Sequence, residues 1–449
     1  MDYNTTLEYI DSFVNFEKIP KYNYASSFKL ERMRVFLQEL GSPYLNNKVV
    51  HIEGSKGKGS TCAIVANILK EAGYLVGLYT SQHLVDIRER IRFLTQGQGA
   101  GDFEGMIERG EFTGLIDRIR PVAERFRDHR ELGKVSFFEI LTACAFLYFR
   151  EKNVDFIVLE TGLGGRLDAT NVAMSLACGI TNISMEHTDK LGNSLGSIAF
   201  EKSGIIKSGG AVFSASQPEE AIAVIRKVCE ETAASLCEIG KDVKYSIVYS
   251  GEDKQVFNLD GPGYSLGDLE INLIGPHQIE NASLAVAMAK FIERRGFKIG
   301  NDSIRRALKD ASWPGRLEIL QRRPYVIVDG AQNRASIKAA LSSIKRAFNY
   351  GRLICIFGIS SDKDIKGVSM ELDNSSDVII LTRAENPRAE NPLRLKENFC
   401  KGCIYLTNNV QEALDMALRI ADEEDLLLVT GSLYIVGEAI KLMKQGKAV

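Results

Sequence analysis

The sequence predicts an α/β protein with a mostly parallel sheet in a first domain and a second, smaller α/β domain at the C-terminus. The chief observation is a short apolar run at residues 49–52, which leads into a glycine-rich turn and then into apolar residues at helical spacing. Further apolar runs alternate with helical patterns, as units of strand, helix and parallel strand require. Because 449 residues exceed what one hydrophobic core supports, we expect two domains, at 1–297 and 298–449.

The turn after the first strand has the composition of a phosphate-binding loop. It consists of Gly54, Ser55, Lys56, Gly57, Lys58, Gly59, Ser60 and Thr61. Glycines let the backbone curl so that several N–H groups point at one anion, and the start of the following helix adds partial positive charge. Lys58 can reach the β- and γ-phosphates of a nucleotide, and Ser60 or Thr61 can contact Mg²⁺.

The match to the strict pattern G-x-x-x-x-G-K-[ST] is incomplete. Ile52 stands at the first glycine position, and Gly59 separates Lys58 from Ser60. A glycine-rich turn that binds no ligand is therefore the alternative to a mononucleotide-binding (P-loop) domain.

Charge and hydropathy favour neither nucleic acid nor membrane as a partner. The chain has 56 Lys and Arg against 58 Asp and Glu, and no apolar run approaches the length of a membrane span. The N-terminus shows no basic region followed by an apolar core, so we expect no signal peptide. The eight cysteines form no disulfide framework, which favours a reducing, cytoplasmic location. Cys400 and Cys403 have metal-type spacing, without a second pair nearby.

Apolar spacing places the elements of the first domain in order. Before the phosphate loop it predicts helices at 7–20 and 28–40, and after the loop a helix at 62–70 and a strand at 74–79. The polar, glycine-rich stretch 94–114 is expected to be a mobile surface loop. Then follow a helix at 137–150, strands at 154–159, 178–183 and 211–213, a helix at 218–234, short antiparallel strands within 243–275 and a helix at 277–295.

The last third of the chain repeats the α/β alternation. Strands are predicted at 325–328, 353–357, 378–381 and 426–429, with helices at 334–348 and after Gly431. This pattern predicts a Rossmann-like C-terminal domain, and residues 296–313 read as the passage into it.

Polar residues follow several of the predicted strands. Ser81 and Glu160 come directly after two of them, and His187 follows a third. Open parallel sheets bind ligands at this end of their strands, so Ser81 and Glu160 can hold a metal beside the phosphates. A turn serine and a solvated glutamate are the alternatives, and a lone histidine such as His187 is more often a structural residue than a ligand. Lys202 lies in an apolar stretch, where a lysine either extends its amine to solvent or takes part in chemistry.

In this order and spacing the segments resemble the folylpolyglutamate synthase and dihydrofolate synthase family, within the Mur-type ATP-dependent amide ligases. The resemblance spans nearly the whole chain. It rests on residues 54–60, 79–84, 89–92, 159–171, 187–189, 201–205, 277–282, 313–318, 329–331, 362–364 and 431–434.

The resemblance implies ATP and Mg²⁺ as cofactors and leaves a second Mg²⁺ and K⁺ open. Lys58 and the loop amides would hold the phosphates, and Ser60, Ser81, Glu160 and His187 would hold the metal. Asn281, Arg316 and Asp329 would contact ATP. Lys202 matches a lysine that is carbamylated in this family, which turns a cation into a carboxylate-like ligand. Lys58, Lys202, His187 and Arg316 would be the catalytic residues.

The resemblance also implies the acceptor. A pterin site would lie near Leu30, Glu31 and Arg32, near Ser136, Phe137, Phe138 and Glu139, and near Leu167, Asp168 and Ala169. The substrates would be ATP, L-glutamate and a folate or pteroate, and the protein would be a monomer. The implied reaction joins glutamate to the carboxylate of dihydropteroate, of tetrahydrofolate or of both, through an acyl phosphate.

The sequence departs from the family pattern at four positions. Lys56 replaces an Asn, Gln82 replaces a Pro, and Gln332 and Arg334 replace the His and Pro of Asp-Gly-Ala-His-Asn-Pro. Gln332 can donate a hydrogen bond as His does but cannot carry a proton. These departures motivate two alternatives, which are the same ligase chemistry on another pterin or amino-acid acceptor and a non-catalytic ATP-binding scaffold.

Overall fold

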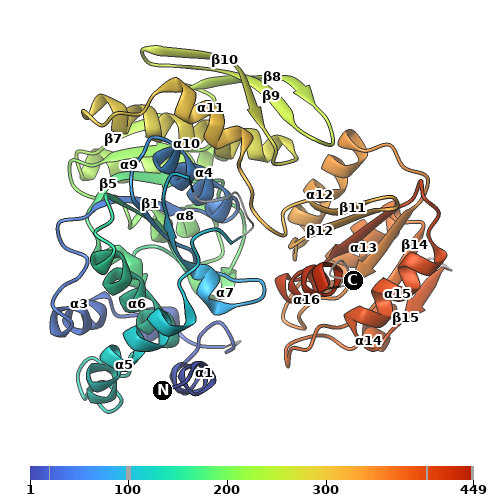
Figure 1. Cartoon of the computed structure of the whole chain (residues 1–449), viewed down its shortest axis with the longest axis horizontal. Coiled ribbons are helices and arrows are strands. Elements are labelled where there is room, and N and C mark those ends of the chain that lie inside the picture. Colours follow the sequence, from blue (N-terminus) through green and yellow to red (C-terminus); the bar gives the residue numbers. More distant parts are fainter. Residues whose placement is uncertain (20, 98–102, 401–402, 446–449) are drawn as a thin grey trace.

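A computed structural model describes residues 1–19, 21–97, 103–400 and 403–445. Figure 1 shows two α/β units, with the C-terminal unit in orange and red beside the larger N-terminal one. Both are built on mostly parallel sheets, as the sequence predicts.

The N-terminal unit contains a seven-stranded sheet in the order β3-β2-β4-β1-β5-β6-β7. All neighbouring strands in it are parallel except β2 and β3. The strands are β1 (Lys48–Glu53), β2 (Val76–Tyr79), β3 (Ile91–Leu94), β4 (Phe156–Glu160), β5 (Ser175–Ile180), β6 (Ala211–Ser214) and β7 (Ser235–Glu238). Because parallel strands end at one edge, the loops after β1, β2, β4 and β5 meet there.

Side chains of this sheet alternate between two buried layers. Phe156 and Val158 of β4 pack into one core, and Ile157 and Leu159 pack into the other. The first layer is formed by α4 (Lys58–Glu71), α10 (Pro276–Arg294) and α11 (Asn301–Lys309). The second contains α1 (Tyr3–Asp11), α3 (Leu30–Glu39), α5 (Arg109–Arg125) and α6 (Phe137–Glu151), with α8 (Leu195–Ser203) and α9 (Glu219–Glu231) farther along the same sheet.

A small antiparallel sheet extends the N-terminal unit, as predicted for 243–275. Its strands are β8 (Lys244–Ser250), β9 (Gln255–Gly261) and β10 (Tyr264–Ile271), in the order β10-β9-β8. Ile304, Ala307, Leu308 and Ala311 belong to the core of the N-terminal unit, so α11 packs there although the predicted boundary lies at 297. That boundary stays a prediction.

The C-terminal unit is a six-stranded sheet in the order β11-β12-β16-β13-β14-β15, in which β11 alone is antiparallel to its neighbour. The strands are β11 (Glu318–Arg322), β12 (Tyr325–Asp329), β13 (Leu353–Phe357), β14 (Val378–Leu381), β15 (Ile404–Leu406) and β16 (Leu426–Thr430). Helices α12 (Arg334–Ala347), α13 (Ile365–Ser375) and α14 (Pro392–Lys396) cover one face, and α15 (Val410–Ile420) and α16 (Leu433–Gln445) cover the other.

Two predictions about elements were wrong. The helix predicted at 7–20 ends at Asp11, because Val14 pairs in an extended bridge with Ser136 and so cannot remain helical. The stretch 94–114 is not all loop, because α5 begins at Arg109 and buries Phe112. The part of that prediction covering 98–102 lies outside the described residues. Strands β3, β7, β11 and β15 were not predicted, since each is too short for a clear apolar pattern.

Two further features of the described residues bear on partners and metals. None of their helices has both the length and the apolar character needed to cross a membrane. Cys62, Cys144, Cys178 and Cys355 are buried free thiols, whereas Cys400 and Cys403 are exposed. Within this part of the chain no group of three or more His, Cys, Asp or Glu is arranged to hold a metal.

Candidate active site

The two units enclose a cavity of about 890 Å³. The loops after β1, β2, β4 and β5 form its floor, and residues of the C-terminal unit form the opposite wall. Most of the residues expected to bind nucleotide or metal line it, namely Ser55, Lys56, Gly57, Lys58, Gly59, Ser60, Ser81, Glu160, His187, Lys202, Asn281, Arg316 and Asp329.

The phosphate loop is held in a shape that needs glycine. Gly57 has φ 93° and caps α4, and a Cβ there would collide with the side-chain amide of Asn281. A Cβ on Gly59 would lie 2.7 Å from the ring of Trp313. The amides of Ser55 and Lys56 donate to the carbonyl of Asn182, so the amides left for an anion are those at the start of α4.

Lys58 is the central cation of the loop. Its Nζ donates to the carbonyl of Gly54 at 2.9 Å. Burial opposes its charge, but the carboxylates of Glu53, Glu160 and Glu186 outweigh burial and raise the pKa of Lys58 above its ordinary value. The amine is therefore positive at neutral pH, and Lys58 lines the cavity.

The residues predicted to hold a metal all line the cavity, and two of them are in contact. The backbone N–H of Ser81 donates to Oε2 of Glu160 at 2.9 Å, which ties the loop after β2 to the end of β4. Burial lowers the pKa of His187 to about 4, so its imidazole is neutral at pH 7 and free to act as a ligand. One carboxylate and the hydroxyls of Ser60 and Ser81 fit a Mg²⁺ that takes its other oxygens from phosphates and water.

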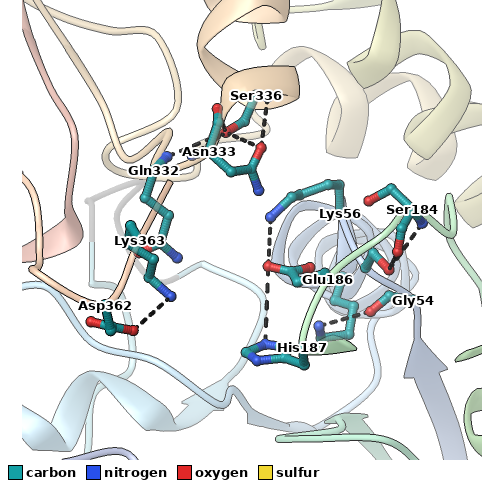
Figure 2. Close-up of polar contacts among 12 residues, drawn as sticks. Gly54, Lys56, Ser184, Glu186, His187, Gln332, Asn333, Ser336, Asp362 and Lys363 are labelled. Atoms are coloured by element: carbon teal, nitrogen blue, oxygen red, sulfur yellow. Dashed lines mark hydrogen bonds and ion pairs between the residues drawn. The ribbon is translucent and has the colours of Figure 1, made fainter. Parts of the chain in front are cut away.

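Lys56 and Glu186 form an ion pair beside the loop, with Nζ and Oε1 2.7 Å apart (Figure 2). Burial of Glu186 opposes ionisation, but Lys56, His187 and Lys58 lower its pKa to about 2. Lys56, which replaces an Asn of the family pattern, is thus paired with its own counter-ion, Glu186, and the shape of the phosphate loop is retained.

Lys202 lies on α8 with 3% of its surface exposed. Its Nζ is 2.5 Å from Oε1 of Glu53 and 2.7 Å from the carbonyl of Gly54. These two acceptors already engage the amine, and a carbamate would place a second carboxylate against that of Glu53. The surroundings therefore do not fit the expected carbamate.

The C-terminal unit brings Arg316, Asp329 and Gln332 to the cavity. Asp329 is a buried carboxylate that accepts the amides of Leu317 and Ala331, so it fixes the backbone just after Arg316 and just before Gln332. Figure 2 shows Gln332 and Lys363 across the cavity from Lys56, Glu186 and His187. Arg334, in contrast, pairs with Glu371 at the surface.

The predicted pterin residues divide into two groups. Ser136, Phe137, Phe138 and Asp168 line the cavity. Leu30, Glu31, Arg32, Glu139, Leu167 and Ala169 are not among the lining residues. Arg32 and Glu139 form a buried ion pair of 2.8 Å, and Glu139 also accepts from Ser136, so these two hold the pocket wall in place. Contact of this second group with a substrate stays a prediction.

Asp168 is buried at the base of this pocket. Its carboxylate accepts the amides of Gly162 and Leu163 and the hydroxyl of Thr170. Burial raises the pKa of Asp168 to about 6. The carboxylate thus shapes the glycine-rich loop after β4.

Sequence reasoning missed several cavity residues. Phe16, Tyr22 and Phe28 come from the segment before α3 and line the cavity together, with ring centroids 4.7–5.9 Å apart. Such clustering of aromatic residues in the sequence could have indicated a pocket. The prediction of a helix at 7–20, which includes Phe16, obscured it. Arg388 also lines the cavity, and nothing local in its sequence marks it. Lys363 lines the cavity too, within the segment 362–364 on which the family resemblance rests.

Comparisons with known proteins agree with this geometry. Residues 136–289 match the Mur ligase middle domain, and residues 315–433 match the glutamate ligase domain of Mur ligases. The dihydrofolate synthase/folylpolyglutamate synthase of Bacillus subtilis is 33% identical over 425 residues, 92% of this chain and 95% of the relative.

Solved structures give the same result. A folylpolyglutamate synthase from Thermotoga maritima has a TM-score of 0.83 at 32% identity and covers 99% of this chain and 97% of its own. One from Mycobacterium tuberculosis, solved with ADP, has a TM-score of 0.87 at 27% identity and covers 98% and 99%. The α/β fold with a P-loop domain and a C-terminal ligase domain is confirmed. The chain belongs to the folylpolyglutamate synthase and dihydrofolate synthase family of Mur-type ligases.

Proposed function

We propose that this protein is an ATP-dependent ligase that joins L-glutamate to the carboxylate of dihydropteroate, tetrahydrofolate or both. The observation that carries the proposal is that one cavity brings together a phosphate loop, metal-side residues and a separate aromatic pocket. Relatives from Bacillus subtilis and Escherichia coli carry both activity names, which favours the bifunctional form.

ATP is proposed to bind with its phosphates at the start of α4. Relatives were solved with ADP and with AMPPCP, which supports ATP as the nucleotide. Lys58 would contact the β- and γ-phosphates, and Asn281 and Arg316 would approach from α10 and the C-terminal unit. Mg²⁺, held by Ser60, Ser81, Glu160 and His187, would supply charge neutralisation on the transferred phosphoryl group.

The acceptor carboxylate would be activated first. One of its oxygens attacks the γ-phosphorus, the bond from that phosphorus to the bridging oxygen breaks, and ADP leaves. Lys58 and Arg316 stabilise the negative charge on the transferring group. The nitrogen of glutamate then attacks the acyl carbon, phosphate leaves, and the amine loses a proton.

The aromatic end of the cavity suits a pterin. Phe16, Tyr22 and Phe28 supply flat apolar surface, and Phe137 and Phe138 add more from the start of α6. An acceptor bound there would extend its carboxylate along the same cavity toward the phosphate loop. Because one chain supplies both walls of the cavity, we propose that the monomer is the active unit.

The test is Mg²⁺-dependent phosphate release from ATP in the presence of glutamate, with dihydropteroate, tetrahydrofolate or no acceptor. Release with dihydropteroate establishes dihydrofolate synthase activity, and release with tetrahydrofolate establishes chain extension. ATP binding without release under either acceptor would contradict the proposal.

A further inference from the structure

An arginine in the cavity wall, Arg388, reaches from one unit to the other. Arg388 of the C-terminal unit donates from Nη1 to the backbone carbonyl of Glu17 at 2.6 Å. Its Nη2 donates to Oδ1 of Asp362, in its own unit, also at 2.6 Å. Asp362 therefore fixes the guanidinium in the orientation that reaches the N-terminal unit.

The far side of this contact is anchored in the core. Both carboxylate oxygens of Glu17 accept from Arg90, each at 2.7 Å, and Arg90 is only 2% exposed. The Nε of Arg90 donates to Nδ1 of His83 at 2.9 Å, and its guanidinium lies 5.7 Å from the ring centroid of Phe137. Glu17 is thus held by the same residue that touches the acceptor pocket and the loop carrying Ser81.

The place of the contact distinguishes it from other links between the units. Glu17, Arg90, Asp362 and Arg388 all line the cavity. Arg322, by contrast, joins Asp253 of the N-terminal unit, and neither residue lines the cavity. A contact in the cavity wall opposes opening of the cavity directly.

We propose that Arg388 and Glu17 are positioning residues that fasten the C-terminal unit over the acceptor end of the cavity. The inference rests on the proposed function, because its consequence concerns an acyl phosphate. Such an intermediate reacts with water as well as with an amine. A fastened cavity keeps water out and holds the glutamate nitrogen near the acyl carbon, so ATP use stays coupled to amide formation.

The experiment compares Arg388→Ala, Arg388→Lys and Glu17→Gln with wild type. The matched control is Arg394→Ala, an exposed arginine of the same unit outside the cavity lining. Phosphate and glutamate-ligated product are measured together with ATP, Mg²⁺, glutamate and dihydropteroate or tetrahydrofolate. We expect the ratio of phosphate released to ligated product to be near one for wild type and control. The ratio should be several-fold higher for Arg388→Ala, and Arg388→Lys should lie between the two. Glu17→Gln should raise the ratio less, because its carbonyl remains.

A second measurement does not depend on the acceptor. Small-angle X-ray scattering should give a larger radius of gyration for Arg388→Ala than for wild type and Arg394→Ala. The proposal is overturned if the scattering of Arg388→Ala equals that of the control. The proposal is equally overturned if Arg388→Ala lowers phosphate release and product formation together, so that their ratio is unchanged. If wild type releases no phosphate with either acceptor, the proposed function fails and the scattering alone decides on the fastening.

Discussion

Lys202 and Glu53 form a buried ion pair, 2.5 Å from Nζ to Oε1, between the end of α8 and the end of β1. The side chain of Lys202 is 4% exposed and that of Glu53 is 1% exposed. The second oxygen of Glu53 is buried and has no hydrogen-bond partner among the described residues. The pair therefore controls both the charge and the geometry behind the phosphate loop.

Removing one member of this pair should destabilise the fold. We expect Glu53→Ala to lower the free energy of unfolding by about 3–5 kcal/mol, because it leaves the Lys202 ammonium buried without its counter-ion. The double variant Glu53→Ala/Lys202→Met should recover much of that loss. Urea unfolding of wild type, Glu53→Ala and the double variant measures these changes in stability. A double variant as unstable as Glu53→Ala would show that the unpaired charge is not the cause.

Whether the amine of Lys202 is carbamylated can be observed directly. Because Glu53 and the carbonyl of Gly54 already engage its amine, we expect wild-type protein in ¹³C-bicarbonate to show no carbamate signal by ¹³C NMR. Lys202→Ala supplies the control spectrum. A wild-type signal that disappears in Lys202→Ala would establish the carbamate that the family resemblance implies.

Lys58→Ala should abolish phosphate release while leaving the fold intact. The side chain supplies charge to the transferring phosphoryl group, and its loss should lower kcat by about 100-fold or more. Circular dichroism and the urea midpoint provide the check on folding. Substantial residual turnover in a folded variant would remove the phosphate-loop role of this residue.

A matched pair of glycine variants tests whether the shape of the phosphate loop is needed for ATP binding. Gly57→Ala should weaken ATP binding by about tenfold or more, because the left-handed backbone is strained and the new Cβ meets Asn281. Gly110→Ala in α5 is the control, since no atom lies within 4 Å of a Cβ there. Titration with a fluorescent ATP analogue compares them, and equal affinities would mean that the loop shape is not needed.

Stability should fall as the pH drops from about 6.5 toward 4. His51 is buried, its Nε2 lies 2.8 Å from the hydroxyl of Thr170, and burial lowers its pKa to about 3. Unfolded protein therefore binds a proton in this range that the folded protein does not, at up to about 1.4 kcal/mol per pH unit. Asp168, with its pKa raised to about 6, acts in the opposite direction.

The measurement is the urea midpoint as a function of pH for wild type and His51→Gln. The variant cannot take up the extra proton, so its loss of stability between pH 6.5 and 4 should be shallower. Parallel curves would show that other groups account for the acid sensitivity.

The sequence by itself determined the phosphate loop, most strands of both sheets and the residues at the strand ends. Those features depend on local patterns, in which a buried strand, glycines and an amphipathic helix follow one another within some 20 residues. Lys58, Ser81, Glu160 and His187 were found in this way, because parallel strands end at one edge of their sheet.

Only the tertiary structure decided which distant residues meet. Glu53 and Lys202 are 149 positions apart, and Glu17 and Arg388 are 371 positions apart. Packing of whole elements sets such contacts, and no periodicity in the chain records them. The same limit made the helix at 7–20 too long, because Val14 leaves the helix to pair with Ser136. Local patterns fix elements, whereas the cavity arises from how those elements pack.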